Sequence, residues 1–148
     1  MKKSIITALL AVMLLSVAAG SATAEVGYAD SMYDAEQAYK YTNIVNRLNS
    51  GTDEDWYYWE NTTSFTQYAT INLLPASSSL NYNVFYLIQL SNGFVPWDSI
   101  GTATDYGPGF TDNSGSLTVP AGAKLFVKVY GVSPLDYSFT DYYTLQIY

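Results

Sequence analysis

Apolar and polar residues alternate with a period of two along most of the chain beyond residue 43. The pattern is clearest where Leu125, Val127 and Val129 are separated by aromatic and basic residues. Because successive side chains of a β-strand point to opposite faces, such alternation predicts strands that bury one face. Strands are predicted at residues 43–48, 56–60, 68–73, 81–90, 99–103, 117–119, 124–130 and 143–148.

Turn-forming residues separate these strands. Asn49-Ser50-Gly51, Asn92-Gly93 and Pro120-Ala121-Gly122 each follow an apolar segment, and glycine, proline and asparagine favour tight turns. Ahead of the strands, Asp30 is a possible N-cap for a short helix between Ser31 and Lys40. Short strands, regular turns and little helix predict an all-β fold: an antiparallel β-sandwich of about seven or eight strands, with a short N-terminal helix or coil.

Two of the predicted strands are apolar on both faces. In residues 81–90, Val84 and Tyr86 alternate with Phe85 and Leu87, so the outer side of this strand must be covered or adhesive. The strand that starts near Trp56 has the same character. The predicted core consists of Tyr57, Trp59, Ala69, Ile71, Val84, Tyr86, Leu125, Val127, Val129, Leu145 and Ile147.

Aromatic residues on the outward faces of these strands are candidates for ligand binding. Flat rings stack on sugar rings or lie along an extended polymer. The alternative is that loops cover them, or that they pair with one another across strands. The candidate ligand-binding residues are Trp56, Tyr58, Tyr68, Phe126 and Tyr130.

The N-terminal residues have the pattern of a secretory signal peptide. Lys2 and Lys3 precede an apolar run, and Ala22-Thr23-Ala24 ends it with small residues, so we expect cleavage after Ala24 and an extracellular product. Removal of residues 1–24 would leave four basic and thirteen acidic residues, a net charge of −9. Such a surface disfavours nucleic acid and anionic lipid. The chain has no cysteine, so its stability rests on the core, supplemented by metal if one binds.

An acidic turn, Asp53-Glu54-Asp55, precedes the aromatic strand. Calcium takes six to eight oxygen ligands, and Asp53, Asp55 and nearby carbonyl groups could supply several. Asp34 or Glu36 would complete the site if the N-terminal segment folds back. The alternative is an ordinary solvated turn, in which these carboxylates bind local backbone groups.

Composition argues against an enzyme. The chain has neither histidine nor cysteine, which excludes Ser/His and Cys/His catalytic groups and thiol nucleophiles. Pairs of carboxylates such as Asp53 with Asp55, or Asp136 with Asp141, remain formally possible for glycoside hydrolysis. Paired acids are common in loops, however, so binding is the favoured function.

The order of strand and turn motifs resembles the bacterial pre-peptidase C-terminal domain, a family of jelly-roll-like β-sandwiches. These motifs are Asp53-x-Asp55-Trp56-Tyr57-x-Trp59, Tyr82-x-Val84-x-Tyr86, Asn92-Gly93, Pro120-Ala121-Gly122, Leu125-x-Val127-x-Val129 and Tyr143-x-Leu145-x-Ile147.

The resemblance implies a domain at residues 43–148 after an N-terminal extension at 25–42. Family members usually follow a secreted peptidase, whereas this chain would be a free-standing copy. Some relatives, in bacterial collagenases, supply calcium ligands from an upstream Glu-Pro-Asn type segment. The corresponding region here departs from that pattern and reads Tyr33-Asp34-Ala35-Glu36-Gln37, whereas Asp53 and Asp55 match in place. We therefore expect a secreted, non-catalytic module that binds extracellular protein or polysaccharide. The alternatives are a jelly-roll carbohydrate-binding module and a self-associating structural protein.

Overall fold

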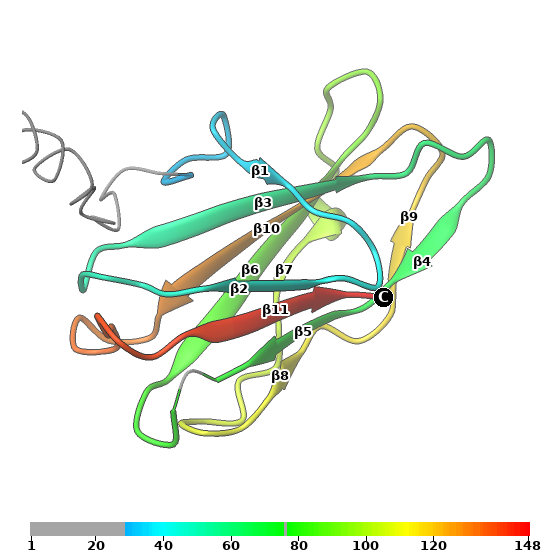
Figure 1. Ribbon diagram of the computed structural model, residues 1–148. Coiled ribbons are helices and arrows are strands. Elements are labelled where there is room, and N and C mark those ends of the chain that lie inside the picture. Colours follow the sequence, from blue (N-terminus) through cyan, green and yellow to red (C-terminus); the bar gives the residue numbers. More distant parts are fainter. Residues whose placement is uncertain (1–28, 76) are drawn as a thin grey trace, which may run out of the picture.

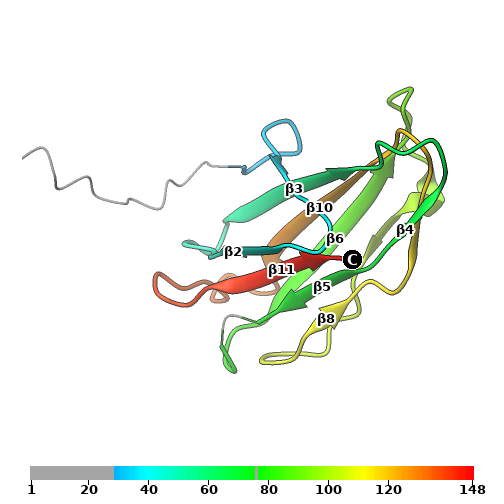
Figure 2. The same ribbon diagram turned by 45° about the vertical axis from the view of Figure 1, so that its right-hand side comes forward.

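The computed structural model describes residues 29–75 and 77–148, so the predicted leader at 1–24 lies outside the described residues (Figure 1). The chain forms two β-layers that face each other (Figure 2). None of the helices in the described ranges is long and apolar enough to cross a membrane.

The first layer is a five-stranded sheet. Its order is β1 (Glu36–Gln37), β3 (Glu54–Glu60), β10 (Lys124–Gly131), β6 (Tyr82–Gln89) and β7 (Ile100–Thr102). The pairs β3–β10, β10–β6 and β6–β7 are antiparallel, and β1 joins β3 in parallel. The longest strands, β3, β10 and β6, therefore occupy the centre.

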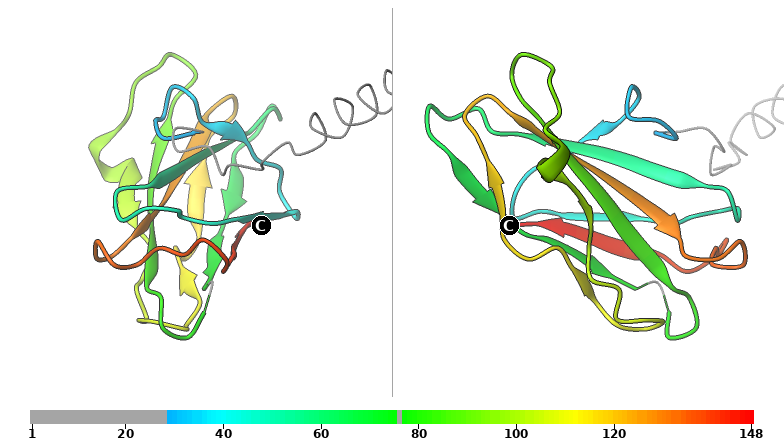
Figure 3. Two further views of the ribbon diagram at one scale, coloured as in Figure 1. Left: turned by 60° about the vertical axis from the view of Figure 1, so that its left-hand side comes forward. Right: turned by 180° about the vertical axis from the view of Figure 1, so that it is seen from behind.

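The second layer is a four-stranded sheet. Its order is β2 (Asn43–Asn46), β11 (Tyr143–Ile147), β5 (Ile71–Leu74) and β8 (Asp112–Asn113). Two short strands, β4 (Gln67–Ala69) and β9 (Leu117–Val119), pair with each other beyond β5 and β8. Thr70 separates β4 from β5 and exchanges two backbone hydrogen bonds with Tyr148. The 3-10 helix η1 (Trp97–Ser99) leads into β7, and the loop before it projects beyond the sheets (Figure 3).

The core lies between the layers, and the alternation along the strands predicted which side chains face it. Both sheets contribute side chains that are at most 1% exposed. They are Tyr57, Val84, Leu125, Val127 and Val129 from the first layer, and Ile71, Leu73, Tyr143, Leu145 and Ile147 from the second. Trp59 and Tyr86 are partly buried against this cluster. The β-sandwich predicted from alternation is confirmed.

The N-terminal segment is not the helix predicted between Ser31 and Lys40. It follows the edge of β3 instead: the Trp56 amide donates to the Ala29 carbonyl at 2.8 Å, and the Ala38 amide donates to the Tyr58 carbonyl at 2.7 Å. An exposed strand edge has unpaired backbone groups that a neighbouring segment can satisfy. Pairing with the edge outweighs the local helix signal, so the extension is part of the sandwich.

We expect Leu125→Ala to lower the free energy of unfolding by about 3 kcal/mol, because it removes a fully buried side chain and leaves a cavity between the sheets. Urea denaturation measures the change. Leu135→Ala is the matched control, because Leu135 is 81% exposed and its truncation should have little effect. Equal losses for the two variants would contradict the observed core.

Candidate functional site

The four carboxylates predicted to bind calcium occupy different settings. Asp53 accepts a hydrogen bond from the Asn49 amide at 2.7 Å, and Asp34 accepts one from the Ser31 hydroxyl at 2.9 Å. Asp53 thus binds a local backbone group and Asp34 a nearby hydroxyl group, so both carboxylates have local partners. Glu36 is exposed in β1, in register with Tyr57.

Asp55 is not part of the turn, because β3 already begins at Glu54. Its side chain lies on the inward face of β3 and is 4% exposed. The Tyr143 hydroxyl donates to Asp55 Oδ2 at 2.5 Å, and Tyr57 and Tyr143 share a hydrogen bond of 2.8 Å. Asn46 Nδ2 donates to the Tyr57 hydroxyl at 3.0 Å. A chain of polar groups therefore crosses the core between the layers.

Burial raises the pKa of Asp55 from 3.8 to about 7. The hydrogen bond from Tyr143 acts in the opposite direction, and the negative charges of Asp53, Asp30 and Glu36 raise the pKa further. A carboxyl removed from water resists ionisation unless a cation or several donors compensate it. Asp55 is thus the most strongly perturbed acid of the N-terminal region.

Asp30 joins these acids, although the sequence indicated only a helix cap there. Burial raises its pKa, and so do the charges of Asp53, Glu54 and Asp34. We call Asp30, Asp34, Glu36, Asp53 and Asp55 the acidic cluster. Across residues 29–75 and 77–148, no three metal-ligating side chains converge closely enough to hold an ion. The cluster members are near enough to repel one another, but their oxygens do not meet at one point.

Four of the five predicted ligand-binding residues share one surface, the outer face of the five-stranded sheet. Tyr58 lies opposite Phe126 in the β3–β10 register, and their ring centroids are 5.9 Å apart. Phe126 is only 7% exposed, so neighbouring side chains cover it. Trp56 contacts Phe85 edge to face at 6.1 Å. The rings partly pair with one another, as the alternative interpretation predicted.

Basic side chains lie over several of these rings. Lys128 Nζ is 5.6 Å from the Trp56 ring centroid, 5.7 Å from that of Phe85 and 5.1 Å from that of Tyr130. It also forms an ion pair of 2.9 Å with Glu54. Attraction between a cation and the face of an aromatic ring stabilises this arrangement. Trp56 and Tyr130 are therefore partly occupied by the protein's own lysine.

Basic side chains lie over aromatic rings throughout the described part of the chain. Each of its four basic residues lies over at least one aromatic ring, at 5.0–5.7 Å from the centroid. These residues are Lys40, Arg47, Lys124 and Lys128. The positive charge of the domain is thus held against its own aromatic surface.

Tyr58 and Phe126 line a hollow of about 460 Å³ where the N-terminal segment passes the sheet. A second hollow of about 460 Å³ adjoins it and shares Gln89 and Lys124. We call the two together the outer groove. Its lining comprises Met32, Tyr33, Ala35, Tyr58, Glu60, Gln89, Leu90, Ser91, Gly93, Gly122, Lys124 and Phe126.

The sequence did not indicate the contribution of the N-terminal segment to this groove. Tyr33 is 92% exposed, and its only sequence signal was an aromatic residue in a polar stretch. Tyr68, the fifth candidate, lies apart from the groove. It is 65% exposed on β4, opposite Thr118 of β9.

No family model and no curated protein matches the sequence. Among solved structures, the chain is similar to the pre-peptidase C-terminal domain of a collagenase from Bacillus anthracis, with a TM-score of 0.54 and 15% identity over 77% of this chain and 94% of that one. It also matches a surface-associated copper-binding protein of Methylomicrobium album BG8, with a TM-score of 0.49 and 11% identity over 77% and 96% of the respective chains. The resemblance suggested by the sequence motifs is confirmed at the level of the fold: the chain forms a β-sandwich like that of a pre-peptidase C-terminal domain.

Proposed function

We propose that this protein is a secreted, non-catalytic module that binds an extracellular polymer, protein or polysaccharide, in the outer groove. The observation that carries the proposal is the groove itself, an aromatic-lined depression that crosses the central strands β3, β10 and β6. The rigid strand β3 fixes the position of Tyr58, which favours recognition without rearrangement, and the largely covered Phe126 packs beside it.

The lining of the outer groove suits a polymer that is uncharged or carries charges of both signs. Aromatic and thioether side chains provide apolar contact area, while Gln89 and Ser91 supply hydrogen-bond donors and acceptors. Lys124 is the groove's only basic residue among those described, and Glu60 lies 3.9 Å from its ammonium group. The groove therefore has little net positive charge, and a polyanion such as nucleic acid is disfavoured.

Two adjoining hollows also favour a ligand longer than a single small molecule. Each has a volume of about 460 Å³, within the range of a drug-sized ligand site. A polymer can occupy both by placing successive units along the sheet, and the exposed Tyr33 extends the contact at one end.

Co-sedimentation with insoluble collagen, cellulose, chitin and peptidoglycan tests the proposal. We expect retention by one of these polymers, and a loss of at least about tenfold in affinity for Tyr33→Ala and Tyr58→Ala, because each removes an aromatic contact. Phe110→Ala is the matched control, since Phe110 is 65% exposed but does not line the groove. Retention of both groove variants at wild-type level would contradict the proposal.

We also propose that calcium binds at the acidic cluster and ties the N-terminal segment to β3. Burial raises the pKa values of Asp30 and Asp55, and repulsion from neighbouring carboxylates raises them further; this smaller, repulsive part is what a bound cation would relieve. Because the oxygens do not converge in this structure, binding requires side chains such as Asp53 to leave their local partners. The ion would stabilise the fold rather than act in chemistry.

A further inference from the structure

The second layer ends in an open strand edge at β2 (Figure 1). Its backbone pairs with β11 on one side, and within residues 29–75 and 77–148 no strand pairs with its other side. An edge of this kind presents unpaired N–H and C=O groups that can accept another strand. In the first layer, by contrast, the N-terminal segment covers the edge of β3 through β1. The free edge of β2 is therefore a candidate interaction surface.

The register of β11 determines which backbone groups of β2 are free. In an antiparallel pair, alternate residues exchange hydrogen bonds, and the residues between them direct their N–H and C=O groups to the opposite side. Thr70 exchanges two such bonds with Tyr148, in continuation of the β5–β11 register. Counting back along β11, Tyr143, Leu145 and Ile147 therefore direct their backbone groups toward β2.

The same alternation continues into β2. Ile44, the partner of Leu145, directs its backbone groups toward β11, as does every second residue of β2. The amide and carbonyl groups of Asn43 and Val45 therefore point away from the sheet. They form none of the backbone hydrogen bonds that the described residues make outside the ladders. Each copy of the chain thus has two free donors and two free acceptors along this edge.

The strand β2 has none of the features that usually protect an edge. Proteins block edge pairing with charged side chains, proline, bulges or very short strands. The sequence of β2 is Asn43-Ile44-Val45-Asn46, which contains neither a charge nor a proline. With four residues it is the longest of the strands that end the two layers, which are β1, β2, β7 and β8. Val45 is 60% exposed, so the edge is open to a further strand.

A hollow of about 410 Å³ adjoins this edge. Ile44 lies at the hollow and is partly buried against the core. The inward-facing side chains of an added strand therefore have room beside it. The lining comes from β1, β2 and β3 and comprises Glu36, Asn43, Ile44, Val45, Asn46 and Tyr57.

We propose that β2 pairs in antiparallel fashion with β2 of a second copy of this chain. When Ile44 lies opposite the second copy's Ile44, Asn43 of each copy lies opposite Val45 of the other. This register joins all the free amide and carbonyl groups of both edges in four hydrogen bonds. It also keeps every side chain on its own face, because residues 43 and 45 lie on one face of the strand and residue 44 on the other.

A second copy is favoured over an unrelated strand because the edge of β2 is complementary to itself. A two-fold axis at Ile44 satisfies both edges at once, whereas an unrelated strand leaves its own second edge unpaired. The two isoleucines meet beside the hollow, and cross-strand pairs of β-branched side chains stabilise a sheet. Neither strand contains a charged residue, so the pairing places no like charges directly opposite each other.

The two-fold axis of such a dimer is perpendicular to the joined sheets. Equivalent faces of the two copies therefore point in the same direction, and both outer grooves open toward the same side. One consequence rests on the proposed function: a long polymer can occupy both grooves, and the second contact raises the overall affinity without any new kind of contact.

Sedimentation equilibrium of the purified protein tests the proposal. We expect a monomer–dimer equilibrium with a dissociation constant between about 10 μM and 1 mM, as for a small interface. Without residues 1–24 each chain has a net charge of −9, so repulsion opposes association, and about 0.5 M NaCl should strengthen the dimer relative to about 0.05 M. Hydrogen exchange adds a residue-specific measurement: the amides of Asn43 and Val45 should become protected as the dimer forms.

Val45→Pro should weaken the dimer at least about tenfold, because it removes an amide donor from each copy. The sandwich should still fold, since proline is tolerated where an edge N–H has no partner within the sheet. Thr102→Pro is the matched control. Thr102 lies in the edge strand β7, and because the Ala103 amide donates to the Val84 carbonyl, the Thr102 amide also points away from its neighbouring strand. This variant should dimerise as the wild type does.

Three results would overturn the proposal. They are a protein that stays monomeric up to about 1 mM, a dimer whose affinity Val45→Pro leaves unchanged, and amides of Asn43 and Val45 that become protected only when an unrelated extended peptide is added. Circular dichroism of each variant separates lost association from lost folding. A monomer can still be retained by a polymer through Tyr58, so failure here is distinguishable from failure of the outer-groove proposal.

Discussion

The free energy of unfolding of calcium-free protein should fall by about 4 kcal/mol as the pH rises from 4 to 7.5. Folding raises the pKa of Asp55 from 3.8 to about 7, and each pKa unit corresponds to about 1.4 kcal/mol. Below pH 4 both states hold the proton, so the full stability is present. Between pH 4 and 7 the unfolded chain releases it while the folded protein keeps it, and stability is lost.

Urea denaturation over this pH range measures the slope of the free energy of unfolding against pH. Asp30 and Asp112, whose pKa values burial also raises, act in the same direction. Asp55→Asn should remove most of the slope and stabilise the protein above pH 7, because its amide oxygen can still accept the Tyr143 hydrogen bond without a buried charge. Asp98→Asn should leave the slope in place. A stability that is constant from pH 4 to 7.5 would contradict a buried, proton-holding Asp55.

Calcium should have the opposite effect at high pH. In chelator-treated protein at pH 8, calcium at a thousandfold excess over its dissociation constant should add about 4 kcal/mol to the free energy of unfolding. A bound cation would compensate the negative charge of the acidic cluster and would link its N-terminal members to β3. Thermal melts with and without calcium measure the effect.

The calcium effect should shrink below pH 7, because ligation requires a deprotonated Asp55. Asp55→Asn should abolish most of the rise in melting temperature, and Asp136→Asn, outside the cluster, should retain it. An unchanged melting temperature in wild-type protein, or a rise that survives combined replacement of Asp53 and Asp55 by Asn, would leave the acidic turn as a solvated loop.

Alternation along the chain was sufficient to predict a β-sandwich and to predict which side chains of its long strands face the core. Tyr57 is buried and Trp56 faces outward because a one-residue shift would expose the whole core set of β3. The same logic could not find β8. Asp112–Asn113 has only two residues, both polar, and it exists because β5 offers backbone partners at Asn72 and Leu73.

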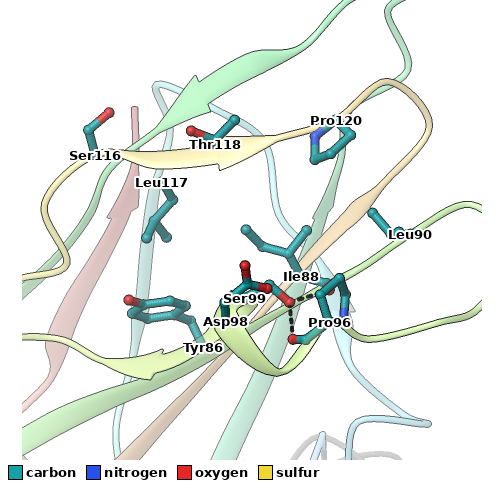
Figure 4. Close-up of a pocket in the computed structure, with 10 residues that line it drawn as sticks. All are labelled: Tyr86, Ile88, Leu90, Pro96, Asp98, Ser99, Ser116, Leu117, Thr118 and Pro120. Carbon is teal, nitrogen blue, oxygen red and sulfur yellow. Dashed lines mark hydrogen bonds between the residues drawn. The ribbon is translucent and has the colours of Figure 1, made fainter.

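The candidate sites were less predictable because they depend on packing between distant segments. The sequence placed Phe126 on the outward face of β10, which the register confirms. Its low exposure arises from lateral neighbours such as Tyr58, which alternation does not report. Tyr86 and Leu117 line one cleft although they lie far apart in the sequence (Figure 4), and no local signal indicates that arrangement.

The pairing of basic side chains with aromatic rings has a consequence for digestion by peptidases. A trypsin-like peptidase cuts after lysine or arginine, and residues 29–75 and 77–148 contain only four such positions. Lys124 and Lys128 lie in β10, between β3 and β6, where cleavage requires the sandwich to open. Lys40 and Arg47 are held at Tyr41, Trp59 and Tyr142. Digestion at Lys124 and Lys128 is therefore limited by how often the native fold opens.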